Sequence, residues 1–246
     1  MKKTQGIVLS ELRYRDTSKI LTIYTRELGK VSVMAQGAYR PKSRLLANTQ
    51  PFSYNEFQFS KGKNFYYINQ ADIIDTFYDI RNKMERIVFG FFMLELIDKS
   101  IVEEEENERI FILLLKGLNI LSKLDKDYLK FIISYELKYI SFLGYRPQIS
   151  SCVNCNQTNS IRSFSISQGG LLCSSCFHLD NNPRQITMEQ VDLMNKLLYT
   201  SMDKLGEIKA DNRILIPINR LIIDYILYNI DRKEFKSLKL LNSSFE

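Results

Sequence analysis

The chain has 246 residues, of which 45% are hydrophobic and 25% charged, a composition that is typical of globular proteins able to bury a core. Its N-terminal apolar stretch is interrupted by Glu11 and Arg13, unlike a secretory signal, and no apolar run reaches the roughly 18 residues of a membrane span. The net charge of +6 is unevenly divided, because residues 1–71 carry twelve Lys or Arg against four acids and the remainder carries 22 against 24. We therefore expect a cytoplasmic protein whose N-terminal third meets a polyanionic partner.

The first seventy-odd residues contain five strand-like segments rich in Val, Ile, Tyr and Phe. They are residues 7–12, 20–25, 31–36, 52–60 and 65–74. The stretch RELGK, with Gly29 near its tip, predicts a hairpin, and the change of aromatic parity in PFSYNEFQFS predicts a β-bulge or sharp bend. Five strands without an intervening helical pattern predict a five-stranded OB-type β-barrel over residues 1–79, with a small open sandwich as the alternative.

From about residue 80 the hydrophobic period becomes helical, which predicts an all-α domain over residues 80–246. Thr187 and Gln190 have the spacing of a capping box, and Gly144 and Pro147 stop the third helix. The predicted helices are residues 84–100, 108–124, 128–142, 188–198 and 217–230. The fold class is therefore α+β and multidomain.

All four cysteines lie in an insert predicted at about residues 150–180, as two Cys-x-x-Cys pairs. They are Cys152, Cys155, Cys173 and Cys176. Four thiolates suit tetrahedral Zn(II), and the spacing is that of two zinc knuckles. Because the insert has little apolar core, we expect the metal to supply its folding free energy. A redox dithiol, two chance pairs, and ancestral ligands that no longer hold metal remain alternatives.

The sequence offers no catalytic constellation. A site closed by four thiolates leaves no position for an activated water, so the predicted zinc is structural. The only histidine, His178, is expected at the surface or beside the metal ligands, and no GxxxxGK[ST] motif occurs. The acidic run at residues 103–106 is predicted to be a solvated loop. We therefore expect no enzyme.

The longest non-strand segment of the predicted barrel reads GAYRPKSRLLANTQ, at residues 37–50. Cationic side chains neutralise phosphates and aromatic faces stack on bases, so this segment and its neighbours predict nucleic-acid binding. The candidate DNA-binding residues are Lys19, Tyr39, Arg40, Lys42, Arg44, Lys61 and Lys63, with the aromatics Phe65, Tyr66 and Tyr67 beside them. A solvated basic loop, with tyrosines that fill the barrel, is the alternative.

Several stretches resemble the bacterial RecO DNA repair and recombination proteins. They are GIVL near the start, GAYRPKSR followed by QPF, ELKYISFLGYRPQISSCVNC, GLLCSSC and the ending FKSLKLL. The resemblance runs over essentially the whole chain. It implies an N-terminal OB fold, a helical C-terminal domain and a zinc-binding insert with the four cysteines as ligands.

The resemblance also implies a function in the RecF pathway of recombinational repair. Family members bind single- and double-stranded DNA, anneal complementary strands, and join RecR to help load RecA onto strands coated by single-strand-binding protein. We accordingly expect a cytoplasmic, nucleoid-associated protein.

The helical domain is where the family receives the acidic C-terminal tail of single-strand-binding protein, and our candidates for that contact are Lys130, Lys138 and Arg220. Tyr39 stands where the family often has a further basic residue. An RNA-binding or ribosome-associated OB protein with a zinc ribbon, and a zinc-dependent hydrolase, are the competing hypotheses.

Overall fold

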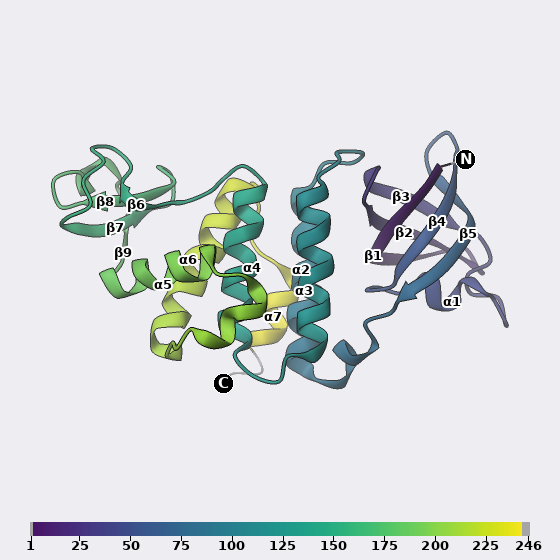
Figure 1. The fold of residues 1–246 in the computed structure, drawn as a ribbon. Coiled ribbons are helices and arrows are strands. Elements are labelled where there is room, and N and C mark those ends of the chain that lie inside the picture. Colours follow the sequence, from purple (N-terminus) through teal and green to yellow (C-terminus); the bar gives the residue numbers. More distant parts are fainter. Residues whose placement is uncertain (1, 243–246) are drawn as a thin grey trace. The chain divides into compact units, whose positions relative to one another are not determined.

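The computed structural model describes residues 2–242 (Figure 1). The chain divides into two compact units, one comprising Met1–Lys123 and Phe235–Glu246 and the other Leu124–Glu234. The first unit thus contains helices as well as the N-terminal strands. The domain boundary predicted at residue 79 falls inside this unit and stays a prediction. Among the described residues, no helix is long and apolar enough to cross a membrane.

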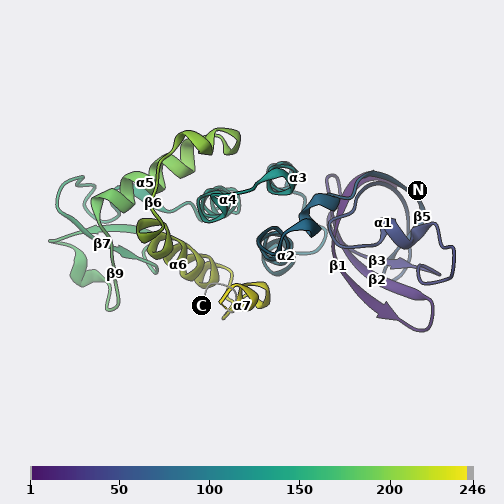
Figure 2. The same ribbon diagram turned by 90° about the horizontal axis from the view of Figure 1, so that it is seen from below.

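Five strands of the first unit form a closed barrel, seen end-on at the right of Figure 2. They are β1 (Lys2–Tyr14), β2 (Ser18–Thr25), β3 (Gly29–Ala35), β4 (Tyr54–Lys61) and β5 (Tyr66–Asp75). Their order around the barrel is β1-β2-β3-β5-β4, and only β3 and β5 pair in parallel. The short helix α1 (Leu45–Asn48) follows β3. The predicted five-stranded OB-type barrel is confirmed, and the open sandwich was wrong.

The predicted turns and bends of the barrel are present. Gly29 has φ +64°, and a Cβ built there would lie 2.2 Å from the carbonyl oxygen of Glu105, so this hairpin position accepts only glycine. The stretch PFSYNEFQFS contains a sharp bend rather than a bulge, since Phe52 has φ 74° just before β4 begins. The register shifts between β4 and β5 leave their extra residues, Ile74 and Asn69, in β5. Phe57 and Phe59 lie two positions apart on β4, so both face the same side of the strand and are buried in the barrel core.

Three helices complete the first unit: α2 (Met84–Ser100), α3 (Glu108–Lys123) and α7 (Lys236–Asn242). Helix α2 is buried on most sides, as its apolar sequence predicts. On α3, the ring of Phe111 lies 6.1 Å from that of Tyr24 on β2, which ties the helix to the barrel. The carboxylate of Glu95 accepts hydrogen bonds from the backbone N–H groups of Lys236 and Ser237, so α2 caps the N-terminus of α7.

The second unit contains α4 (Tyr128–Phe142), α5 (Met188–Tyr199) and α6 (Asn212–Asn229). The predicted capping box is present, since Thr187 accepts from the backbone of Gln190 and the Gln190 side chain accepts from that of Thr187. The prediction that the last long helix begins at about Pro217 was wrong. It begins at Asn212 because Asp211 caps it through the backbone N–H of Arg213.

The cysteine insert of the second unit holds a four-stranded sheet. Its strands are β6 (Gln148–Cys152), β7 (Ile161–Ser165), β8 (Gly170–Cys173) and β9 (Arg184–Gln185), in the order β6-β8-β7-β9. Phe164 on β7 is fully buried, with its ring edge-on to that of Tyr225 on α6 at 5.5 Å. One aromatic contact thus packs the insert against the helices.

A fully buried carboxyl lies between α4 and α6. The amide of Asn219 donates to Oε2 of Glu136 at 3.2 Å, and Oε1 has no hydrogen-bond partner among the described residues. Burial raises the pKa of Glu136 well above its usual value, which the Asn219 hydrogen bond only partly opposes. The folded state therefore binds a proton at Glu136 more tightly than the unfolded state does.

We expect Glu136→Gln to make the protein more stable at pH 8, by an amount on the order of 1 kcal/mol. The pKa of Glu136 is higher in the folded than in the unfolded state, so the buried carboxyl destabilises the protein least below the unfolded-state pKa of about 4.3. The free energy of unfolding then falls as the pH rises from that value through the folded-state pKa. Urea unfolding at pH 5 and pH 8 measures the effect, and the gain should be larger at pH 8. The exposed Glu207 provides the control variant Glu207→Gln. Equal gains at both pH values would contradict the assignment.

Candidate nucleic-acid interface and metal centre

The loop between β3 and α1 carries three of the predicted cations. Arg40, Lys42 and Arg44 are all exposed. The loop is a series of turns, in which the N–H of Arg40 donates to the carbonyl of Gly37 at 3.0 Å and the N–H of Ser43 to that of Arg40 at 3.0 Å. The N–H of Tyr39 donates to Thr17 at 2.9 Å, which anchors the loop on the β1–β2 hairpin. The cations are thus presented from a defined backbone.

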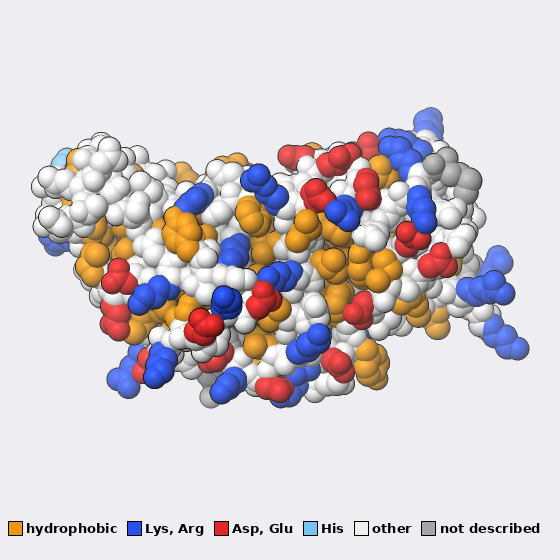
Figure 3. Space-filling model, viewed as in Figure 1, with side chains coloured by type: hydrophobic (Ala, Val, Ile, Leu, Met, Phe, Trp, Pro, Cys, Tyr) orange, Lys and Arg blue, Asp and Glu red, His pale blue; other side chains and the backbone are white. Residues whose placement is uncertain are grey.

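An open hollow of about 410 Å³ lies at this end of the barrel. It is bounded by the β1–β2 hairpin, the end of β3 and the β4–β5 turn. Three cations and three aromatic rings line it: Arg15, Arg40, Lys63, Tyr14, Phe65 and Tyr67. Figure 3 shows lysine and arginine side chains projecting from the barrel at the right of the view. The hollow therefore joins groups that neutralise phosphates to rings that can stack on bases.

Arg15 is a member of this set that the sequence analysis missed. It lies in the hairpin between β1 and β2, apart in sequence from the loop that carries Arg40. The excess of positive charge over residues 1–71 includes Arg15, but only the barrel closure brings it to the same hollow as Arg40 and Lys63. No local sequence signal could have identified it.

The ammonium group of Lys19 makes a cation–π contact with Tyr39, a residue of the loop between β3 and α1. The side chain of Lys19 is only 2% exposed, and its ammonium group donates to the carboxylate of Glu11. The same ammonium lies 4.6 Å from the centroid of the Tyr39 ring, and the guanidinium of Arg13 lies 5.6 Å from it. The charge of Lys19 is therefore compensated within the barrel, while Tyr39 remains 38% exposed.

Lys61 and Lys63 differ in their surroundings although they are two residues apart. Lys63 is exposed and lines the hollow. The ammonium of Lys61 donates to both carboxylate oxygens of Glu104, at 2.8 and 3.1 Å. Glu104 and its neighbours Glu103, Glu105 and Glu106 are exposed, as predicted for a solvated loop, but this loop is also bonded to the barrel. Arg40 and Lys63 thus lie at the same hollow, whereas Lys61 is paired with the carboxylate of Glu104.

The three basic candidates of the second unit also differ. Lys130 is buried, and its ammonium donates to the carbonyl of Ile208 at 2.8 Å. Lys138 donates to the carbonyls of Leu197 and Leu198 near the C-terminal end of α5, at 2.6 and 2.8 Å. Arg220 is exposed on α6. Two of the three side chains thus satisfy backbone carbonyls within the unit.

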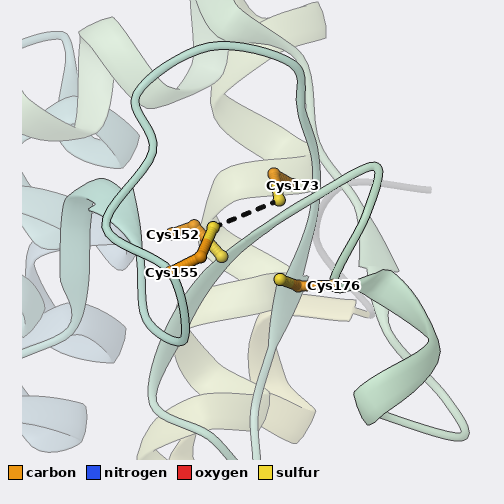
Figure 4. Close-up of side chains that lie close together, drawn as sticks. All are labelled: Cys152, Cys155, Cys173 and Cys176. Carbon is orange, nitrogen blue, oxygen red and sulfur yellow. Dashed lines mark hydrogen bonds between the residues drawn. The ribbon is translucent and has the colours of Figure 1, made fainter.

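The four cysteine sulfurs converge, lying within 4.8 Å of one another (Figure 4). Cys152 and Cys173 end β6 and β8, and Cys155 and Cys176 lie in the turns that follow these strands. The sulfurs of Cys155 and Cys173 are 3.6 Å apart, close to the separation of about 3.8 Å between thiolates placed tetrahedrally around one zinc ion. The donor set and its spacing therefore fit a single metal ion.

The polar surroundings of the sulfurs favour negative charge. The amide of Asn154 donates to the sulfur of Cys176 at 3.3 Å. Burial opposes ionisation of Cys152, but backbone N–H groups of Cys155, Cys173 and Asn154 outweigh it and lower the pKa of Cys152 to about 6. The backbone N–H of Gln157 favours the Cys155 thiolate, yet desolvation and the neighbouring thiols raise the pKa of Cys155 to about 12. A bound cation would let all four ionise together.

His178 lies outside this cluster. It is exposed in the short 3-10 helix Phe177–Leu179, with its ring 6.4 Å from that of Phe177. Among the described residues, the group that could hold a metal consists of the four cysteines and does not include it. This placement agrees with the prediction of a surface position.

Two protein-family models match the chain, one on each side of residue 80. The model described as Recombination protein O N terminal matches residues 1–77, and the model described as Recombination protein O C terminal matches residues 81–239. The chain belongs to the RecO family. The resemblance predicted from short stretches of sequence is thereby confirmed over nearly the full length.

The relatives confirm this membership. A protein named DNA repair protein RecO from Alkaliphilus metalliredigens is 35% identical over 240 residues, which cover 97% of each chain. One of the same name from Acetivibrio thermocellus is 34% identical over 236 residues, covering 95% of this chain and 94% of the relative. A third, from Halalkalibacterium halodurans, is 32% identical over 224 residues, covering 91% and 87%. The similarity therefore includes the barrel, the helices and the insert.

Proposed function

We propose that the protein is a DNA-binding mediator of recombinational repair that acts without nucleotide hydrolysis. Membership of the RecO family supports a role in DNA repair and recombination. The observation that carries the proposal is the hollow at the end of the barrel, where three cations and three aromatic rings face the same space. Such a surface suits a flexible single strand whose phosphates and bases are both accessible.

In this proposal the cations bind phosphates and the rings stack on bases. Arg15, Arg40 and Lys63 neutralise phosphates along the hollow, and Lys42 and Arg44 extend the basic surface along the exposed loop. The remaining candidates are Lys19, Tyr39 and Lys61. Lys19 acts as a positioning residue, because its buried ammonium holds the Tyr39 ring at the edge of the loop. None of these contacts reads a base edge, so binding is independent of sequence.

Annealing follows from the same surface. Two complementary strands repel each other through their phosphates, and a protein that screens this charge while leaving base edges free lowers the barrier to pairing. We assign both single- and double-stranded DNA as ligands, with RecR, the C-terminal tail of single-strand-binding protein and, indirectly, RecA as partners at the nucleoid. The barrel of residues 1–79 serves as the DNA-binding domain, and residues 80–246 serve as the helical domain of the partner contacts.

Zinc is the ion that we assign to the four cysteines. Four thiolates within 4.8 Å of one another, with the sulfurs of Cys155 and Cys173 3.6 Å apart, suit tetrahedral Zn(II) and leave no ligand position for substrate. The role is therefore structural, and we propose no enzymatic activity at this site. The chain's own contribution is to hold the thiolates in register through β6 and β8 and to donate backbone N–H groups to them.

The basic loop should set the salt dependence of single-strand binding. We expect the triple substitution of Arg40, Lys42 and Arg44 by Ala to weaken binding and to flatten its dependence on salt, because each lost phosphate contact reduces the slope of log K against log salt by about 0.7. Fluorescence anisotropy at several salt concentrations measures both quantities. Substituting the exposed Lys204, Lys209 and Lys233 by Ala changes the net charge equally and is the matched control. An unchanged slope of log K against log salt in the loop variant would contradict the assignment of these three residues to phosphate binding.

Strand annealing is the direct test of the mediator function. We expect complementary dye-labelled oligonucleotides coated with single-strand-binding protein to pair faster when the protein is added without nucleotide. The loop variant should accelerate pairing less, since it screens fewer phosphates. An annealing rate that the wild-type protein leaves unchanged would count against the mediator assignment, and stronger binding to matched RNA than to DNA would favour an RNA-binding protein.

We expect loss of the cysteines to reduce metal binding and thermal stability more than the affinity for DNA. We expect substitution of Cys152 and Cys155 by Ser to abolish zinc binding and to lower Tm, because folding of the insert depends on the ion. Metal analysis, thermal unfolding and single-strand affinity measure the three effects. Substitution of the exposed Ser174 and Ser175 by Ala, between the second pair of cysteines, is the control. Loss of DNA affinity in a double-cysteine variant that remains folded would argue against a purely structural role.

A further inference from the structure

The acidic segment at residues 103–106 is built onto the wall of the barrel. The N–H of Glu104 donates to the carbonyl of Lys30 on β3 at 2.9 Å, and Lys30 and Glu103 form a parallel β-bridge. The backbone of Glu105 lies so close to Gly29 that any Cβ there would collide with it. The segment is therefore held by backbone contacts, and the carboxylates of Glu103 and Glu104 bond to Ser32 and Lys61 of the barrel.

Glu104 points its carboxylate at the start of the β4–β5 turn. Its two oxygens accept from the ammonium of Lys61 at 2.8 and 3.1 Å, and one of them also accepts from the hydroxyl of Tyr66 at 3.2 Å. Glu104 itself has φ 58°, in the left-handed region that residues with a side chain adopt at a cost. The backbone thus accepts local strain where it presents this carboxylate.

An anion that a cation and a hydroxyl hold in this way resembles a bound phosphate. Carboxylate and phosphate oxygens accept from the same donors, and an ammonium group binds either as a point charge. The hydrogen bond to Glu104 raises the pKa of Lys61, and that from Lys61 lowers the pKa of Glu104, so each stabilises the charge of the other. Both side chains are more than half exposed, which leaves the pair weak enough for a polyanion to replace the carboxylate.

The position of this pair links it to the proposed DNA surface. Lys61 precedes Lys63 by two residues, and Lys63 and Phe65 of the β4–β5 turn line the hollow together with Tyr67 at the start of β5. We propose that Glu104 is an intramolecular competitor of nucleic acid, whose carboxylate occupies at Lys61 the place of a phosphate and so weakens binding along this side of the barrel. The inference rests on the proposed DNA-binding function and adds an autoinhibitory contact to it.

Glu104→Gln tests the competition directly. Glutamine keeps the shape and a hydrogen-bond acceptor for Tyr66 but releases Lys61, so one further phosphate can be bound. We expect the slope of log K against log salt for a single-stranded oligonucleotide to steepen by about 0.7, equivalent to a gain of about fivefold in affinity at 0.1 M salt. Thermal unfolding of the variant checks that the segment still packs on the barrel.

A double-mutant cycle separates local competition from a change in net charge. Lys61→Ala should reduce affinity more in the Glu104→Gln background than in the wild type, because only there is Lys61 available to a phosphate. Glu106→Gln removes the same charge from the same segment, and within residues 2–242 the exposed Glu106 side chain makes no hydrogen bond or ion pair. We expect Glu106→Gln to change the affinity less than Glu104→Gln does.

The outcomes distinguish this inference from the proposed function. Equal effects of Glu104→Gln and Glu106→Gln, or equal costs of Lys61→Ala in both backgrounds, would overturn the competition while leaving DNA binding in place. Salt-independent or absent binding in every variant, the wild type included, would overturn the DNA-binding function and the competition together.

Discussion

Closure of the barrel by the parallel pairing of β3 with β5 is the constraint on which the rest of the first unit depends. Only two residue pairs make it, Val33 with Tyr66 and Met34 with Tyr67. This short seam brings the β1–β2 hairpin, the loop after β3 and the β4–β5 turn to one hollow. It also leaves the start of β3 without a strand partner on that side, and the acidic segment bonds there at Lys30.

The same closure divides the cations of the barrel into two groups. Arg15, Arg40 and Lys63 meet at the hollow, where like charges are kept apart by the strands and turns that carry them. Lys19 and Lys61 each have a carboxylate partner, although the Lys19 side chain is buried and the Lys61 side chain is exposed. Total charge is thus a poor guide to the charge that a ligand meets, because pairing removes part of it locally.

The sequence predicted those features whose causes are local. The strands, the bend before β4, the helix cap at Thr187 and the cysteine spacing each depend on residues close together in the chain, and each is present. The pairing of Lys61 with Glu104 spans 43 residues and depends on how the α2–α3 loop meets β3, for which no short pattern exists. The burial of Lys19 was missed for a related reason, since Glu11 becomes its neighbour only through the register of β1 and β2.

The insert shows how a segment with few apolar residues can still fold. Three of the four cysteines are buried, and these three form a small core cluster with Leu172, so without an ion this interior would be a cluster of thiols. Thiolates gathered within 4.8 Å repel one another without a cation, whereas a bound ion converts that repulsion into four short bonds. On the proposed zinc assignment, metal binding and folding of the insert are coupled, and the contact of Phe164 with the Tyr225 ring joins the insert to α6.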